Sequence, residues 1–341
     1  MKVRRTSKGW TLGLGILALM LSCHRRESTP GNQARPASSV PTTAVVRSGA
    51  QVPGNREADT PTQLMVDATS PYVAGLAVDA DAIYLFTDRA AHRFAPGASP
   101  QQIALENGAT AAATRTDLVY WSKGAIWKVP KVGGEARRIV SLAHQPQSFL
   151  AAGDDFAWLD MPVPDQFQIQ TLVDHNVRTL LYYAGRIETA AMDAGRVYFV
   201  KRESASTWRI GSVLIHGGEA LYAAPHTGPT PAKLAVAGDV FYYELNSGEI
   251  RRLAADFSHE EVLRKDLICS PIAVSSRIYC SNLEGLFQLA GHPGGKVKPV
   301  FAESRRIAAV AASSSLLAWL SDAGPDRLSL MTIPLTRDDT D

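Results

Sequence analysis

The chain has 341 residues, with 35 Lys and Arg residues against 33 Asp and Glu residues. The positive excess lies in the first 22 residues, and the remainder carries 31 basic against 33 acidic residues. No basic patch is left that would suit a nucleic acid, and this class of partner is excluded. About 280 residues remain for folding, which ordinarily indicates two domains unless a repeat organises them.

The first predicted element is an export signal over residues 1–22. Four basic residues precede an apolar run from Trp10 to Leu21, which is the order found in a signal peptide. The run is about a dozen residues long and falls short of the roughly 20 that a membrane-spanning helix needs. We therefore expect this segment to be cleaved.

Residues Met20-Leu21-Ser22-Cys23 resemble the bacterial lipobox, in which an aliphatic residue and two small residues precede an acylated cysteine. The resemblance implies that Cys23 is lipidated and that the protein is exported and anchored in the membrane of the cell envelope. His24 is not the Asp that retains enteric lipoproteins at the inner membrane, so the resemblance favours the outer membrane. The alternative is ordinary secretion, with Cys23 incidental.

Residues 23–61 are predicted to form a disordered tether between the lipid and the folded domain. They are rich in Pro, Ser, Thr, Gly and charged residues and contain almost no large apolar side chains. Such a segment cannot bury enough apolar surface to offset the entropy lost on ordering. The folded domain is expected over residues 62–335, followed by a polar tail over residues 336–341.

A repeat of about 39 residues organises the folded domain. Its clearest copy is LVYWSKGAIWKVPKVGG at residues 118–134, in which two apolar and aromatic runs are joined by a polar turn. The core of the first run occurs in seven copies. These cores are Ile83–Leu85, Val119–Trp121, Phe156–Trp158, Val197–Phe199, Val240–Tyr242, Ile278–Cys280 and Leu317–Trp319.

Each copy has the pattern of a four-stranded antiparallel sheet. Small apolar residues, such as those at 75–79 and 234–238, precede the core, and runs of alternating polarity, such as 125–130, follow it. Small side chains suit an inner strand that crowds a central axis, and mixed polarity suits outer strands that meet water. Seven such sheets arranged radially predict an all-β fold, a seven-bladed β-propeller.

The ends of the repeat region predict how the ring closes. The seventh copy lacks a fourth strand, and residues 62–68 have the pattern of one. We expect them to pair with the strand around residues 328–332, which would remove an exposed edge. No long amphipathic helix is predicted, and a helical turn or two is allowed only at residues 255–265.

Tyr120-Trp121-Ser122, the run Ile126–Pro130 and the pair Gly133-Gly134 resemble YWTD-type repeats and the related NHL and TolB-like propeller repeats, especially those of secreted propeller proteins in myxobacteria and relatives. The resemblance spans residues 62–335 as a period, but only the second copy matches closely. It implies a binding or scaffold module, because most such families have that role and few are enzymes. A likeness of fold does not fix function.

Cys269 and Cys280 lie eleven positions apart in the first and second strands of the sixth copy. A hairpin centred between Val274 and Ser275 would place them opposite each other, within the Cα separation that a disulfide tolerates. An exported protein also meets an oxidising compartment. We expect a disulfide; the alternatives are two buried thiols or a register shifted by one residue.

Irregular connections ahead of the first strands are the predicted ligand-binding positions, because they open near the axis of a propeller. We single out His144, Arg186, His226 and Arg305. Arg305 and Arg306 next to Arg186 would suit an anionic ligand. Other residues of these connections are Tyr72, Asn107, Gln145 and Glu188.

No catalytic residue, metal site or cofactor is predicted. The eight histidines show no HExxH, HxH or Cys–His spacing. The sequence also lacks a GxSxG nucleophile elbow, a phosphate-binding loop and a GxGxxG after a strand. Asp154 and Asp155 could pair for acid–base work, but they fall in the turn of the repeat, where Asp favours the turn itself.

Three hypotheses for the function follow. The leading one is a monomeric, surface-tethered propeller that binds a protein or glycan partner in the cell envelope and performs no chemistry. The alternative is an envelope hydrolase or lyase with its site at the axial mouth, which predicts acidic or His residues converging there and a bound metal. The third is a structural envelope lipoprotein without a small ligand.

Overall fold

The computed structural model of the chain describes residues 62–66, 73–87, 90–96, 98–105, 110–245, 247–265, 267–269, 272–275, 277–302, 306–324 and 327–335. The predicted signal, Cys23, the tether and the polar tail lie outside these residues. All regular structure in the described part of the chain is β. In the same part, no helix is long and apolar enough to cross a membrane.

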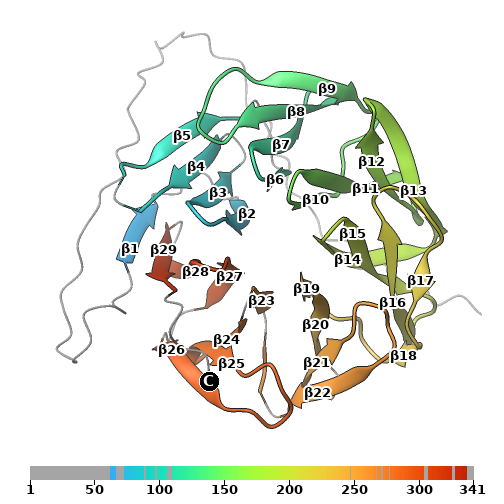
Figure 1. Ribbon diagram of the computed structural model, residues 1–341, viewed down its shortest axis with the longest axis vertical. Coiled ribbons are helices and arrows are strands. Elements are labelled where there is room, and N and C mark those ends of the chain that lie inside the picture. Colours follow the sequence, from blue (N-terminus) through green and yellow to red (C-terminus); the bar gives the residue numbers. More distant parts are fainter. Residues whose placement is uncertain are drawn as a thin grey trace, which may run out of the picture. The chain divides into compact units, whose positions relative to one another are not determined.

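Seven antiparallel sheets form a ring around a central axis, so the domain is the seven-bladed β-propeller that the repeat predicts (Figure 1). Blade 1 contains β2 (Val73–Val78), β3 (Ile83–Thr87), β4 (Ala90–Phe94) and β5 (Gln101–Ala104). Blade 2 contains β6 (Ala111–Ala113), β7 (Asp117–Ser122), β8 (Ala125–Pro130) and β9 (Arg137–Ser141). Blade 3 contains β10 (Ser148–Ala152), β11 (Asp155–Val163), β12 (Gln166–Val173) and β13 (Asn176–Ala184).

The other blades follow the same order from the axis outward. Blade 4 contains β14 (Arg186–Asp193), β15 (Arg196–Arg202), β16 (Thr207–Leu214) and an outer strand split into β17 (Leu221–Tyr222) and β18 (His226–Thr227). Blade 5 contains β19 (Leu234–Ala237), β20 (Asp239–Glu244), β21 (Glu249–Leu253) and β22 (Glu260–Arg264). Blade 6 contains β23 (Ile272–Val274), β24 (Ile278–Asn282), β25 (Gly285–Leu289) and β26 (Val297–Ala302). Blade 7 contains β27 (Ile307–Ala312), β28 (Leu316–Gly324), β29 (Arg327–Pro334) and β1 (Thr62–Val66).

The ring is closed by β1, as the missing fourth strand of the last copy predicts. β1 pairs antiparallel with β29, so that Thr62 lies opposite Thr332 and Val66 lies opposite Leu328. The innermost strands contact one another in cyclic order, from β2 through β27 and back to β2. β1 covers the outer edge of β29 and gives the last blade four strands.

The large side chains of the second strands fill the spaces between blades. Because successive residues of a strand point to opposite faces, one set packs toward the preceding blade and the next toward the following one. Tyr242 packs with side chains of blade 4, whereas Tyr243 packs with those of blade 6. Aromatic side chains of the same kind that are buried in other blades are Tyr84, Tyr120, Trp158, Phe199 and Trp319.

Residues 255–265 do not form the helical turns that the sequence allowed. Asp256 accepts hydrogen bonds from the backbone N–H and the hydroxyl of Ser258, at 3.0 and 2.6 Å, and fixes a turn. The residues that follow form β22, which pairs with β21. A strand forms here instead of a helix because strand pairing places Leu263 in the buried cluster shared by blades 5 and 6. Tertiary packing of this kind overrides a weak helix propensity.

Candidate binding face

The two faces of the ring carry different parts of the chain. Because antiparallel strands alternate in direction, the turn between the second and third strands of a blade and the connection to the next blade lie at the same end. We call this side the crossover face; it includes the turn at 282–285 and the connection at 142–147. The predicted axial positions are expected on this face.

The structure places two of the predicted ligand-binding residues on the crossover face. His144 is exposed in the connection between β9 and β10, and Arg186 is the exposed first residue of β14. No hydrogen bond or ion pair between these two side chains is found among the described residues. Arg305 lies outside the described residues, whereas its neighbour Arg306 is exposed just before β27.

Arg186 belongs to a charged group at the end of blade 4. Its Nε lies 3.2 Å from Glu188 Oε2, and Arg202 Nε lies 2.8 Å from Oε1 of the same carboxylate. The Glu188 side chain is 12% exposed and holds two solvent-exposed guanidinium groups. Sequence reasoning missed Arg202, although the β14–β15 hairpin places it opposite Arg186.

The structure places His226 on the outer wall of the ring rather than in an axial connection. It lies in β18 and pairs with Trp208 of β16. The sequence suggested a connection because His226 precedes the first strand of blade 5. The outer strand of blade 4 is interrupted around Pro225, which has no backbone N–H to donate to the ladder. The strand resumes after the interruption, and His226 is part of it.

His226 joins blades 4 and 5 through a half-buried polar group. Its ring stacks on Trp208, with centroids 4.3 Å apart, and its Nε2 lies 3.7 Å from Glu260 Oε1. Burial lowers the pKa of His226, although the negative charges of Glu260 and Glu244 act in the opposite direction. Tyr242 donates a hydrogen bond to Glu260, and its pKa is raised, first by burial and then by this carboxylate.

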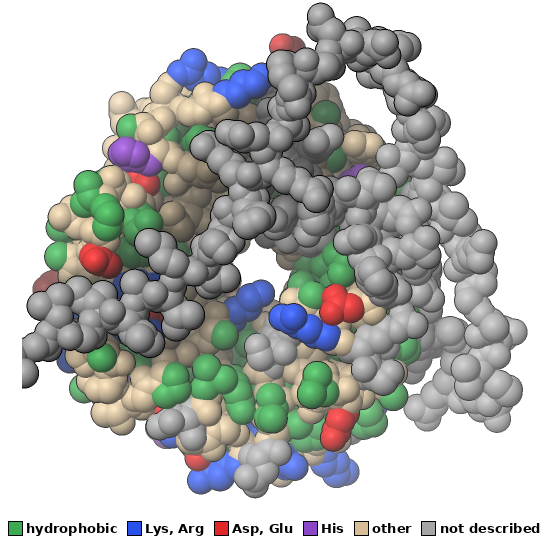
Figure 2. Space-filling model, turned by 180° about the vertical axis from the view of Figure 1, so that it is seen from behind, with side chains coloured by type: hydrophobic (Ala, Val, Ile, Leu, Met, Phe, Trp, Pro, Cys, Tyr) green, Lys and Arg blue, Asp and Glu red, His purple; other side chains and the backbone are tan. Residues whose placement is uncertain are grey.

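The side chains of the innermost strands, which surround the axis, are mostly small and apolar. The seven innermost strands carry three titratable residues, Arg186, Glu188 and Asp193, and all three belong to β14. Figure 2 shows an opening at the centre of the ring with charged side chains beside it. No group of three or more His, Cys, Asp or Glu that could hold a metal is found within the described ranges.

Three large aliphatic side chains are exposed on the crossover face of blades 5 and 6. Leu245 in the β20–β21 turn is 49% exposed, Ile268 in the connection between the blades is 68% exposed, and Leu283 in the β24–β25 turn is 78% exposed. We call these residues the apolar triad. Close neighbours of the triad in the chain share one buried cluster that joins the two blades, namely Tyr243, Leu267, Cys269 and Cys280.

Sequence reasoning missed the apolar triad, although a comparison of the seven copies contains a signal for it. The equivalent turns have Lys123-Gly124 in blade 2, Pro164-Asp165 in blade 3 and residues 203–206, Glu-Ser-Ala-Ser, in blade 4. Polar residues, proline and glycine at turn tips are explained by turn geometry. Turn geometry does not explain Leu245 and Leu283, because neither side chain is needed to form the turn or the core.

The turn that carries Leu245 is fixed by a buried ion-pair network. Arg251 lies 2.8 Å from Glu244 and 2.6 Å from Glu249, the two residues that flank the turn. Burial alone would raise the pKa of Glu249, but hydrogen bonds from Lys265 and Arg251 lower it below its ordinary value. Arg251 thereby joins the two residues that flank the turn.

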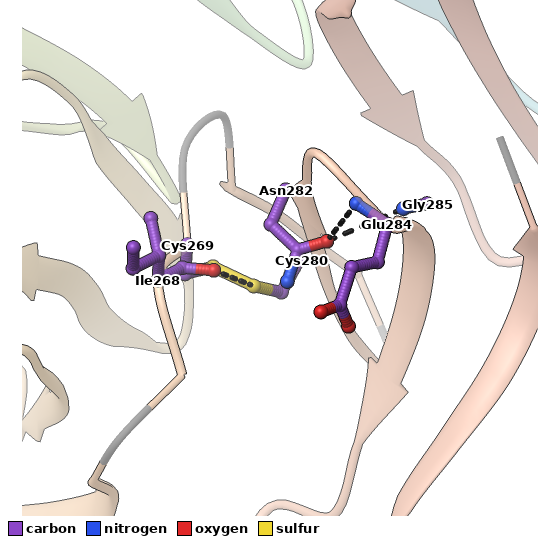
Figure 3. Close-up of a disulfide and its surroundings, with 6 residues drawn as sticks. All are labelled: Ile268, Cys269, Cys280, Asn282, Glu284 and Gly285. Atoms are coloured by element: carbon purple, nitrogen blue, oxygen red, sulfur yellow. Dashed lines mark hydrogen bonds between the residues drawn. A yellow bond between two sulfur atoms is a disulfide. The ribbon is translucent and has the colours of Figure 1, made fainter. Parts of the chain in front are cut away.

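Ile268 immediately precedes a disulfide that joins Cys269 and Cys280, whose Cα atoms are 5.2 Å apart (Figure 3). The two cysteines do not occupy the cross-strand positions that the sequence suggested. Cys280 lies opposite Ile272 in the β23–β24 ladder. Cys269 reaches it from the segment ahead of β23, because the hairpin is shifted from the expected register. The disulfide attaches the segment that carries Ile268 to blade 6.

Leu283 lies at the tip of a turn that is held by hydrogen bonds to the side chain of Asn282. Asn282 Oδ1 accepts hydrogen bonds from the N–H groups of Glu284 and Gly285, at 2.8 and 3.2 Å (Figure 3). Gly285 has a φ of 144°, which a residue with a side chain rarely adopts. Because the tip is fixed, little conformational entropy is lost when a partner covers Leu283.

Comparison with known proteins bears on the fold. No protein-family model matches the chain, and the comparison with curated proteins found no match. A chain in the crystal structure of the mitotic checkpoint complex has a TM-score of 0.59 at 11% identity, over 85% of this chain and 99% of that chain. A chain in the nidogen/laminin complex has a TM-score of 0.43 at 16% identity, over 56% of this chain and 79% of that chain. The first of these likenesses shows the fold alone.

Proposed function

We propose that this protein is a non-catalytic β-propeller that binds a protein partner through the crossover face of blades 5 and 6. The observation that carries the proposal is the apolar triad, in which each side chain stands on a separately fixed turn or connection. Large apolar side chains that are exposed together on one face mark sites of protein interaction, and side chains held in place before binding lose little conformational entropy when they are covered. A glycan suits the triad less well, because sugar rings pack on flat aromatic side chains and the triad has none.

We also propose, from the sequence, that the domain is displayed in the cell envelope. Basic residues and an apolar run lead to Cys23, and the polar segment after it has the composition of a flexible tether. Replacement Cys23→Ser should abolish labelling by a radioactive fatty acid and move the protein from the membrane fraction to the soluble fraction. An unchanged membrane fraction would refute the lipid anchor.

Site-specific photocrosslinking in the native envelope tests the binding face. A benzophenone amino acid placed singly at positions 245, 268 and 283 should trap the same partner from all three sites. The matched control is position 132, because Val132 is 71% exposed at the tip of a turn on the other face of blade 2. Trapping of the same partner from position 132, or of no partner from the triad, would contradict the proposal.

The trapped partner, once purified, allows a quantitative test. Leu245→Ser and Leu283→Ser together should weaken binding to the full chain at least tenfold, which corresponds to about 1.4 kcal/mol or more. Val132→Ser should leave the affinity unchanged. Isothermal titration measures both, and melting curves establish that each variant is folded. Equal affinities for the parent protein and the double variant would overturn the role of the triad.

A further inference from the structure

A groove lies on the outer part of blade 6. It has a volume of about 740 Å³ along β25, β26 and the turn that joins them. At Gly294 it adjoins a second hollow of about 410 Å³, whose other residues are Val262–Lys265 at the end of β22. We call the two hollows together the rim groove. It is lined by residues other than the apolar triad.

The rim groove is built on a fixed seam between the two blades. The N–H of Gly294 donates a hydrogen bond to the carbonyl of Leu263, at 3.2 Å. Arg252 donates a second one to the carbonyl of Gly291, at 3.3 Å, and is itself held by Asp239 at 2.6 Å. The turn of blade 6 is thereby attached to blade 5 at the place where the two hollows adjoin.

The lining of the rim groove has basic side chains and no carboxylate. The basic residues are Arg264, Lys265, Lys296, Lys298 and, when protonated, His292. Lys265 pairs with Glu249 at 3.1 Å, and Lys298 also has a partner. Arg264 and Lys296 are exposed and form no ion pair with any described residue. Lys and Arg side chains gather along the lower rim in Figure 2, in the part of the ring that blades 5 and 6 occupy.

The remaining lining narrows the choice of ligand. Val297, Pro299 and Ala290 supply apolar surface, and no Phe, Tyr or Trp side chain lines the groove, which disfavours stacking of sugar rings. Pro299 has no N–H to donate at its position in the outermost strand β26, so addition of a partner strand along this edge is disfavoured as well. Recognition at this surface must therefore depend on side chains, with anionic groups facing Arg264 and Lys296, which form no ion pair with a described residue.

We propose that the rim groove binds an extended acidic peptide segment of a protein. Its carboxylates meet Arg264 in the hollow at the end of β22 and Lys296 in the adjoining hollow along β26, and its small apolar residues cover Val297 and Pro299. Basic clusters recognise acidic segments in this way, because charge-assisted hydrogen bonds to carboxylates are stronger than neutral ones. This surface is independent of the crossover face, and both can be occupied at once.

A defined probe tests the proposal on the full chain. A fluorescein-labelled decapeptide of alternating Glu and Ala should bind saturably in fluorescence anisotropy, and its affinity should fall at least threefold when salt rises from about 50 to 300 mM. The double variant Arg264→Glu/Lys296→Glu should weaken binding at least tenfold. The matched control is Arg137→Glu/Lys233→Glu, which makes the same charge change at exposed residues of other parts of the ring and should alter the affinity less than twofold.

Four results would overturn the proposal. The first two are that the Glu peptide binds the Arg264→Glu/Lys296→Glu variant as tightly as it binds the parent, and that a peptide with Gln in place of Glu binds the parent as tightly as the Glu peptide does. The third is that no saturable binding is seen at millimolar peptide. The fourth is that polygalacturonate binds more tightly than the Glu peptide, with the same dependence on Arg264 and Lys296. The last result would assign the groove to an acidic glycan. The variant Leu283→Ser should bind the Glu peptide as the parent does, so this proposal and that of the crossover face can fail separately.

Discussion

Gly211 lies in the middle of β16, where a side chain would collide with two aromatic rings. A Cβ atom there would lie 2.5 Å from Phe199 Cζ and 2.9 Å from Tyr222 Cδ1. We predict that Gly211→Ala lowers the free energy of unfolding by about 1–3 kcal/mol, because the rings must move apart. Urea unfolding measures this loss. The control is Gly291→Ala, where no atom lies within 4 Å of the new Cβ; a similar loss there would contradict the prediction.

His226 is the second residue with a measurable prediction, because it is 10% exposed and burial lowers its pKa. The unfolded chain takes up a proton on this histidine near pH 6.5, before the folded protein does. The free energy of unfolding should therefore fall as the pH falls from about 7 to 5. Burial also lowers the pKa of His92. His92 therefore contributes to the same pH dependence of stability, and His226 accounts for part of it.

The variant His226→Phe isolates this part, because a Phe ring can still stack on Trp208 but cannot be protonated. We expect the difference in unfolding free energy between pH 7.5 and 5.5 to become smaller than in the parent protein, as measured by urea unfolding. His144→Phe, at an exposed position of a connection, serves as control and should keep the parent's difference. A His226→Phe variant with the parent's full pH dependence would refute the assignment.

At the scale of elements, the attachment of the segment ahead of β23 to β24 can be tested chemically. In the chain from residue 62 onward, Cys269 and Cys280 are the two cysteines. Thiol titration of this chain, unfolded without reductant, should find no free thiol, and two should be found after reduction. Replacement of both cysteines by Ser should cost about 2–4 kcal/mol, because it frees a loop of about a dozen residues in the unfolded chain. Two free thiols before reduction would contradict the bond.

The elements also show where sequence reasoning succeeds and where it fails. The third strands were predicted well, and the run 125–130 is β8 residue for residue, because alternation of polarity along a strand is a local property. The misassigned segment 255–265 and the split outer strand of blade 4 have weak local patterns. Their structure is decided by packing of Leu263 and Trp208 against the adjacent blade, which no local pattern reports.

At the scale of the whole molecule, ring closure depends on a strand that precedes the first blade in the chain. We predict that the chain beginning at residue 67, without β1, melts about 10 °C or more below the chain beginning at residue 62, because β29 loses its outer partner and the ring can open. Differential scanning calorimetry compares the two chains directly. Melting temperatures within about 2 °C of each other would show that β1 contributes little to closure.

The sequence by itself determined the all-β class, the seven blades, the aromatic packing between them and the closing role of the strand at Thr62. These properties follow from the spacing of apolar residues, and spacing along a chain survives folding unchanged. Only the tertiary structure decided that His226 packs between blades 4 and 5, that Leu245, Ile268 and Leu283 share one exposed face, and that the hollows lined by Arg264 and Lys296 adjoin at Gly294. Those relations join residues of different strands or blades, and the relative placement of blades is set by packing between them rather than by any local pattern.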